Sequence, residues 1–158
     1  MKSFALAAAF FSAATSVHAE CADDRLTVVG DWGKATFTVD VADDPSERAE
    51  GLMFVESMPT LSGMLFVYEA PSAVSFWMKN TLIPLDMIFA GPEGAVVSVH
   101  ENAIPGDLTP IPGGDDIQFV LEINGGLSQR LGIGPGDTIQ HPSIGTEALL
   151  PCEAQGES

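Results

Sequence analysis

The sequence predicts an all-β domain, mainly β with one or two short helices, folded as a compact sandwich or a partly closed barrel. Three observations lead to this prediction. Apolar and β-branched residues occur in many short runs, Gly, Pro and Asp separate these runs, and apolar and polar residues alternate within several of them. Alternation with a period of two is typical of strands that have one buried face, and short, evenly broken runs are typical of all-β folds.

The first two runs predict a hairpin. Leu26–Val29 and Ala35–Val41 flank the turn sequence at residues 30–33, which contains two glycines and an aspartate. In the second run Phe37 and Val39 alternate with polar neighbours. We therefore expect the two apolar side chains to point into the core.

A short helix is expected next, starting after Asp44. Asp44 is a suitable N-cap, Pro45 fits the first helical turn, and Glu47 is placed for a capping box. Gly51 follows within two turns, so we expect the helix to end near it.

The rest of the chain predicts further strands and one helical turn. Gly and Pro clusters set the expected breaks between them. We expect strands at residues 63–68 and 73–79, a hairpin of residues 85–90 and 95–101, a surface loop at 104–114, a strand at 117–123, a helical turn at 127–131 and a last strand at 137–140.

Residues 1–19 are interpreted as a cleavable secretory signal peptide. Lys2 precedes a short apolar run, and small residues precede an expected cleavage site after Ala19. The run is too short to span a bilayer, and Glu20 stands where a lipoprotein signal needs a small residue before Cys21. We therefore expect a periplasmic or secreted protein without a membrane span, with one domain at residues 20–152 and a loose tail at 153–158.

The charge is strongly acidic, with 6 basic and 22 acidic residues and a formal net charge of −16. Removal of Lys2 with the signal peptide would make this −17. Binding to nucleic acid phosphates or to anionic membranes requires a Lys and Arg surface, so these partners are not expected. We expect a monomer without a cofactor, whose partner is a small polar ligand or an envelope protein.

Only two cysteines are present, Cys21 and Cys152, near the two ends of the predicted mature chain. An even number of cysteines in an exported chain favours a disulfide. We expect one structural bond that joins the chain ends.

Four motifs follow one another along the chain, at Arg48–Met53, Gly63–Phe66, Phe76–Thr81 and Pro84–Met87. Together they resemble the signature of the domain of unknown function 192 family. The resemblance continues through residues 120–122 and 136–137 and covers about residues 35–140. It implies a compact, mainly β domain that is often exported, and it implies no established activity.

The predicted strands carry a few polar residues that are candidates for a ligand site. If the polar faces coincide, an indole for stacking, a lysine for an anionic group and carboxylates for hydroxyls would line one site. An alternative is that Lys79 only pairs with a carboxylate and that Arg48 is a second structural partner. The candidates are Trp77, Lys79, Asn80, Thr81, Asp86, Glu122 and Arg48.

Two further functions remain open. A hydrolase could use Asp86 and Glu122 as paired carboxylates, which requires them to lie several ångströms apart on one site. A Cu(I) carrier could use soft thioethers, with Met53, Met64, Met78 and His100 as the candidate ligands.

The sequence contains none of the common motifs for a nucleophilic serine, a zinc helix or a phosphate loop. We therefore expect a cell-envelope binding or accessory module rather than an enzyme.

Overall fold

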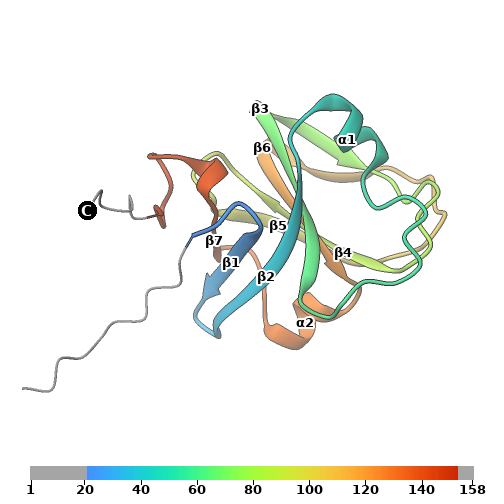
Figure 1. The fold of residues 1–158 in the computed structure, drawn as a ribbon, viewed down its shortest axis with the longest axis horizontal. Helices are drawn as coiled ribbons and strands as arrows, with labels where there is room; N and C mark the ends of the chain where they lie inside the picture. The colour runs from blue at the N-terminus through green and yellow to red at the C-terminus, as the bar shows by residue number, and fades with distance from the viewer. Residues whose placement is uncertain (1–20, 153–158) are drawn as a thin grey trace, which may run out of the picture.

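Seven strands form one curled sheet in the order β5-β4-β6-β3-β2-β1-β7 (Figure 1). The computed structural model describes residues 21–152, so the predicted signal peptide (1–19) and tail (153–158) lie outside the described residues. The predicted mainly β class is confirmed. The strands are β1 Arg25–Gly30, β2 Gly33–Ala42, β3 Ser62–Phe76, β4 Leu85–Ala90, β5 Val96–Ala103, β6 Ile111–Asn124 and β7 Thr138–Gln140, with helices α1 Pro45–Glu50 and α2 Leu127–Leu131 and a 3-10 helix at Pro142–Ile144.

The sheet curls until its two edges approach each other. All neighbouring strands pair in antiparallel fashion except β2 and β3, which are parallel and connected through α1. At one end the edges meet, where Val96 N donates to Asp137 O at 2.8 Å and Ile139 N donates to Gly94 O at 2.8 Å. The structure is therefore a half-barrel, within the predicted range of architectures.

The helix α1 begins and ends as its sequence predicts. The Asp44 carboxylate accepts hydrogen bonds from Ser46 N at 2.7 Å and Glu47 N at 2.9 Å, so it satisfies two otherwise free amides of the first turn. Glu47 reaches back to Asp43 N at 3.2 Å, one residue earlier than a regular capping box. Gly51 ends the helix with a φ of 51°, a conformation that favours glycine.

The predicted break between residues 68 and 73 is wrong, because β3 runs without interruption from Ser62 to Phe76. Its pairing with β6 shifts register between Val67 and Ser72 and again near Val74, so bulges let the strand bend. The strand also ends earlier than expected, and Trp77 lies beyond it. The predicted loop at 104–114 is too long as well, since β6 already begins at Ile111.

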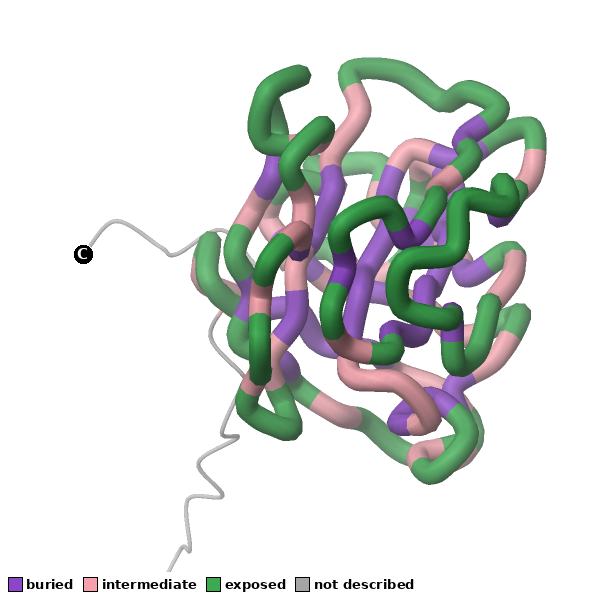
Figure 2. Tube along the Cα trace, turned by 90° about the vertical axis from the view of Figure 1, so that its right-hand side faces the viewer, coloured by how far each residue is buried: buried purple, intermediate pink, exposed green. Residues whose placement is uncertain are grey.

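Two apolar clusters lie on opposite faces of the central strands. In β6 the alternation is clear, since Phe119, Leu121 and Ile123 belong to one cluster and Val120 to the other. All six residues of β4 are buried, because this strand is covered on both faces. Figure 2 shows the buried central strands behind a layer of exposed loops.

The predicted disulfide is present between Cys21 and Cys152. It joins the two ends of the described chain next to β1 and β7, while α1 lies on the opposite side of the molecule (Figure 1). None of the helices within residues 21–152 combines the length and the apolar character that a membrane crossing needs.

Candidate functional site

A small cavity opens between the end of α1, the segment that follows β3, and β6. Its volume is about 40 Å³, which is room for about three water-sized groups. Five of the seven predicted ligand residues line it, although they come from separate parts of the chain. The lining residues are Arg48, Ala49, Glu50, Gly51, Leu52, Met53, Phe66, Phe76, Trp77, Lys79, Thr81 and Glu122.

Glu122 is the buried acidic group of this cavity. It lies on β6 between Met64 of β3 and Met87 of β4, which are its partners in the strand register. Only 4% of its surface is exposed. Within residues 21–152 its carboxyl group makes no ion pair and no hydrogen bond. No enclosed polar side-chain atom of this range lacks a partner, so the Glu122 oxygens are not sealed in the core but keep access to the cavity. Burial therefore raises the pKa of Glu122 from 4.5 to about 8, because the charged form loses its solvation.

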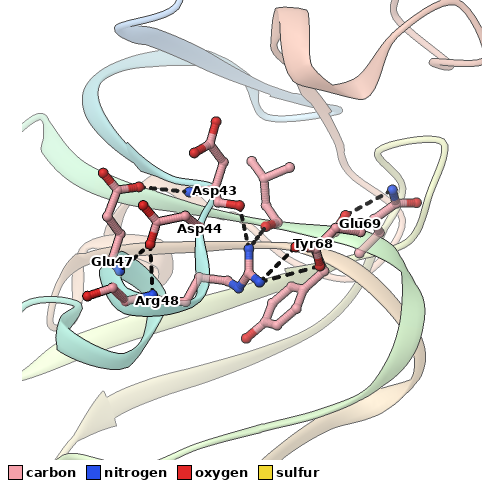
Figure 3. Close-up of polar contacts among 9 residues, drawn as sticks. Asp43, Asp44, Glu47, Arg48, Tyr68 and Glu69 are labelled. Atoms are coloured by element: carbon pink, nitrogen blue, oxygen red, sulfur yellow. Dashed lines mark hydrogen bonds and ion pairs between the residues drawn. The ribbon is translucent and has the colours of Figure 1, made fainter.

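Arg48 lines the cavity, but its charge is already engaged (Figure 3). One guanidinium nitrogen donates to the carbonyl oxygens of Asp43 at 2.6 Å and Val67 at 2.8 Å, and the other donates to Glu69 at 3.0 and 3.3 Å. The guanidinium also lies 5.0 Å from the centre of the Tyr68 ring. Arg48 thus ties α1 to β3, as the structural interpretation predicts.

Trp77 and Lys79 contact each other beside the cavity. The Lys79 ammonium lies 5.1 Å from the centre of the Trp77 ring, which is a cation–π distance. Trp77 is 49% exposed, and Lys79 is exposed as well. Among the described residues Lys79 forms no ion pair, so the expected pairing with Asp86 or Glu122 does not occur.

Asn80 and Thr81 shape the loop that carries Lys79. Asn80 has a φ of 54°, its carbonyl accepts from Phe54 N at 2.8 Å, and its amide donates to Met53 Sδ at 3.8 Å. Thr81 is buried, and its hydroxyl donates to the Lys79 carbonyl at 3.4 Å. Thr81 lines the cavity, whereas Asn80 does not line it and instead forms hydrogen bonds with Met53 and Phe54.

Asp86 lies on the other face of the sheet, which corrects the prediction that it shares a site with Glu122. The register pairs Asp86 with Ile123 and pairs Met87 with Glu122, so the two carboxylates point to opposite faces. The paired-carboxylate hydrolase requires them on one site, and this arrangement therefore excludes it.

The fully buried Asp86 carboxylate has a structural task instead. It accepts four hydrogen bonds, from Asn102 N, Gly126 N and Ser128 N at 2.8 Å each, and from the Ser128 hydroxyl at 2.6 Å. These contacts join β4, the end of β5 and the first turn of α2.

Of the four predicted copper ligands, His100 lies apart from the three methionines. Met78 is fully buried in the apolar cluster against which Met64 packs, and Met53 lines the cavity. His100 is exposed on β5, which β4 separates from β6. Within residues 21–152 no group of three or more His, Cys, Asp or Glu side chains is arranged to hold a metal ion.

The sequence interpretation missed the apolar wall of the cavity. Phe66 and Phe76 meet edge to face with ring centres 4.9 Å apart, and both line the cavity. Gly51 fits against this wall, because a Cβ atom there would lie 3.2 Å from Phe66. The sequence predicts that Gly51 ends the helix. It does not predict that Gly51 approaches Phe66, a strand residue 15 positions later.

Two solved structures resemble this fold. A protein of unknown function from Novosphingobium aromaticivorans is 44% identical, with a TM-score of 0.72, over 73% of this chain and 82% of that chain. A suggested transcription regulator from Sinorhizobium meliloti is 37% identical, with a TM-score of 0.74, over 80% of this chain and 98% of that chain. No curated protein matches the chain.

The family model for DUF192, described as an uncharacterized ACR, matches residues 27–141. This range spans the sheet from β1 to β7 and includes every residue that lines the cavity. The chain therefore belongs to the DUF192 family.

Proposed function

We propose that this protein is an exported binding or accessory module of the cell envelope, which holds a small polar ligand in the cavity beside Glu122. The observation that carries the proposal is the carboxyl group of Glu122, which is only 4% exposed, makes no hydrogen bond within residues 21–152 and lines the cavity. Burial of a carboxyl group costs stability, and a polar group that enters the cavity can supply the hydrogen bonds that the described chain does not.

The cavity surroundings support a ligand that is partly polar and partly apolar. With its pKa raised to about 8, Glu122 carries a proton at neutral pH and can both donate and accept a hydrogen bond. The half-exposed indole of Trp77 offers a flat surface for the part of the ligand that remains outside. A volume of about 40 Å³ admits one small head group rather than a whole molecule.

Export is supported by the signal-peptide pattern in the sequence of residues 1–19 and by the disulfide between Cys21 and Cys152. The mass of the mature protein, isolated from its native cell, tests this part. A product that begins at Glu20 is expected, and a cytoplasmic product that retains Lys2 contradicts export.

The suggested role of the Sinorhizobium relative in transcription is not extended to this chain. Contact with DNA phosphates depends on a Lys and Arg surface, whereas this chain has 6 basic and 22 acidic residues.

Thermal unfolding in the presence of small polar compounds tests ligand binding. A ligand present at about one hundred times its Kd stabilises the folded state by about 2.7 kcal/mol, which gives a clear rise in Tm. We expect Glu122→Gln and Trp77→Ala to lose this rise. Val97→Ala is a matched control for Trp77, because Val97 is similarly exposed on β5 and lines no part of the cavity. Equal stabilisation of all four proteins, or of none, contradicts the proposal.

A further inference from the structure

We propose that the head group entering the cavity is an ammonium, so that the protein binds a small organic amine. This inference rests on the proposed function and specifies its ligand. It departs from the sequence expectation, in which Lys79 would hold an anionic group.

The balance of charges in the cavity favours a cation. Four charged or ionisable side chains line it, namely Arg48, Glu50, Lys79 and Glu122. Arg48 forms an ion pair with Glu69 and donates to two carbonyl oxygens. Two carboxyl groups, of Glu50 and Glu122, then line the cavity beside one ammonium, that of Lys79, and release of the Glu122 proton leaves negative charge in excess. The acidic field of the whole chain also concentrates cations near its surface.

The walls of the cavity also suit a cation. Phe66, Phe76 and Trp77 contribute aromatic rings, and ring faces attract ammonium groups. The Lys79 ammonium already lies 5.1 Å from the Trp77 ring centre, so a cation is accommodated at this ring. Lys79 is exposed and free of an ion pair within the described chain, so an incoming amine can displace it. We therefore assign Lys79 the role of a competitor for the ligand.

Binding of an ammonium requires Glu122 to release its proton to the solvent. The O–H bond of the carboxyl group breaks, the proton passes to the buffer, and the remaining carboxylate pairs with the ammonium; the amine itself keeps all its protons. Because burial keeps Glu122 protonated up to about pH 8, the affinity for the ammonium rises with pH below that value.

The groups around Glu122 do not reverse this dependence. The other charged groups that line the cavity are Arg48 and Glu50 of α1 and Lys79, and the strand neighbours Met64 and Met87 do not titrate. Glu69 stays ionised, since a backbone hydrogen bond and Arg48 lower its pKa. Burial raises the pKa of Tyr68, which therefore stays neutral.

Isothermal titration calorimetry with three probes of one shape tests the inference. The probes are n-butylammonium, butyramide and butyrate, which differ only in the head group. We expect n-butylammonium to bind most tightly, with an affinity that rises about tenfold per pH unit below the pKa of Glu122. Titrations in buffers of different ionisation enthalpy should show release of about one proton per amine bound.

Three variants complete the test. Glu122→Gln keeps the shape of the protonated side chain and should lose amine binding. Lys79→Ala should keep or strengthen it, because it removes the competing cation. Lys34→Ala removes another exposed lysine, on β2 and away from the cavity, and should leave it unchanged.

Tighter binding of butyrate or butyramide would overturn the amine inference but leave the proposed small-ligand site in place. Amine binding without proton release in the wild-type protein would overturn it too, and this readout does not depend on any variant. If none of the three probes binds while other compounds stabilise the protein at this cavity, only the amine inference fails.

Discussion

Replacement of Glu122 by Gln should remove a specific pH dependence from the stability of this protein. Burial raises the pKa of Glu122 from 4.5 to about 8 in the folded state. The unfolded chain therefore loses this proton near pH 4.5, while the folded chain holds it up to about pH 8. Between these values the folded state binds one more proton, so its stability falls as the pH rises.

The size of the effect follows from the pKa shift. One pKa unit corresponds to 1.36 kcal/mol, so the free energy of unfolding should fall by about 5 kcal/mol over the whole window, or about 1.4 kcal/mol per pH unit. Glutamine does not titrate and resembles the protonated form. The variant should therefore gain stability relative to wild type, by about 3 kcal/mol between pH 5.5 and pH 7.5.

Urea unfolding of both proteins at several pH values, with the disulfide intact, measures this difference. His141 also contributes to the pH dependence, with the opposite sign, because burial lowers its pKa. Its contribution is common to both proteins and cancels in the comparison. Parallel stability curves for wild type and Glu122→Gln would refute the conclusion that Glu122 is buried in a protonated form.

Three further changes test the structural interpretation, each by urea unfolding. Reduction of the disulfide, or Cys21→Ser, should destabilise the protein by up to about 5 kcal/mol, because the bond closes a loop between residues 131 positions apart; an unchanged midpoint would contradict a structural bond. Asp86→Ala should cost about 3 kcal/mol or more, since it leaves four donors, two of them buried and two part-buried, without their acceptor, and a loss below 1 kcal/mol would contradict this role. Gly51→Ala should destabilise the protein more than Gly106→Ala. Both residues have positive φ, but only Gly51 approaches Phe66. Equal losses would mean that backbone strain alone accounts for the effect and that the contact with Phe66 contributes nothing.

Local features of the fold were predictable from the sequence. Asp44 caps α1 and Gly51 ends it, because these effects depend on neighbouring residues alone. The predicted strand at 117–123 lies within β6, where Phe119 and Leu121 belong to one apolar cluster and Val120 to the other, since the period of a strand is also local.

Features that depend on strand register were not predictable. Asp86 was grouped with Glu122, but antiparallel pairing places Asp86 opposite Ile123 and on the other face. A shift of one residue in the register of β4 against β6 would place Asp86 on the same face as Glu122. Neither strand's sequence alone determines this register. The bend of β3 through Pro71 likewise depends on its pairing with β6, so the sequence suggested a break there.

The cavity residues are brought together partly by closeness in sequence, which was predictable, and partly by strand register, which was not. Trp77, Lys79 and Thr81 were close in sequence and could be grouped. Glu122 was included from its polarity alone, and Phe66 was missed because an apolar strand residue looks the same whether it fills a core or lines a cavity.

The bond between Cys21 and Cys152 holds their Cα atoms 5.7 Å apart, on the opposite side of the molecule from α1 (Figure 1). Any sequence attached at either end therefore leaves from nearly the same point. An affinity tag, a sensor-chip linker or a fused reporter joined at Cys21 or Cys152 would start from the side of the domain away from α1, whose last turn lines the cavity (Figure 1). Immobilised through either end, the domain turns its α1 side, which bears the cavity, toward the solution (Figure 1).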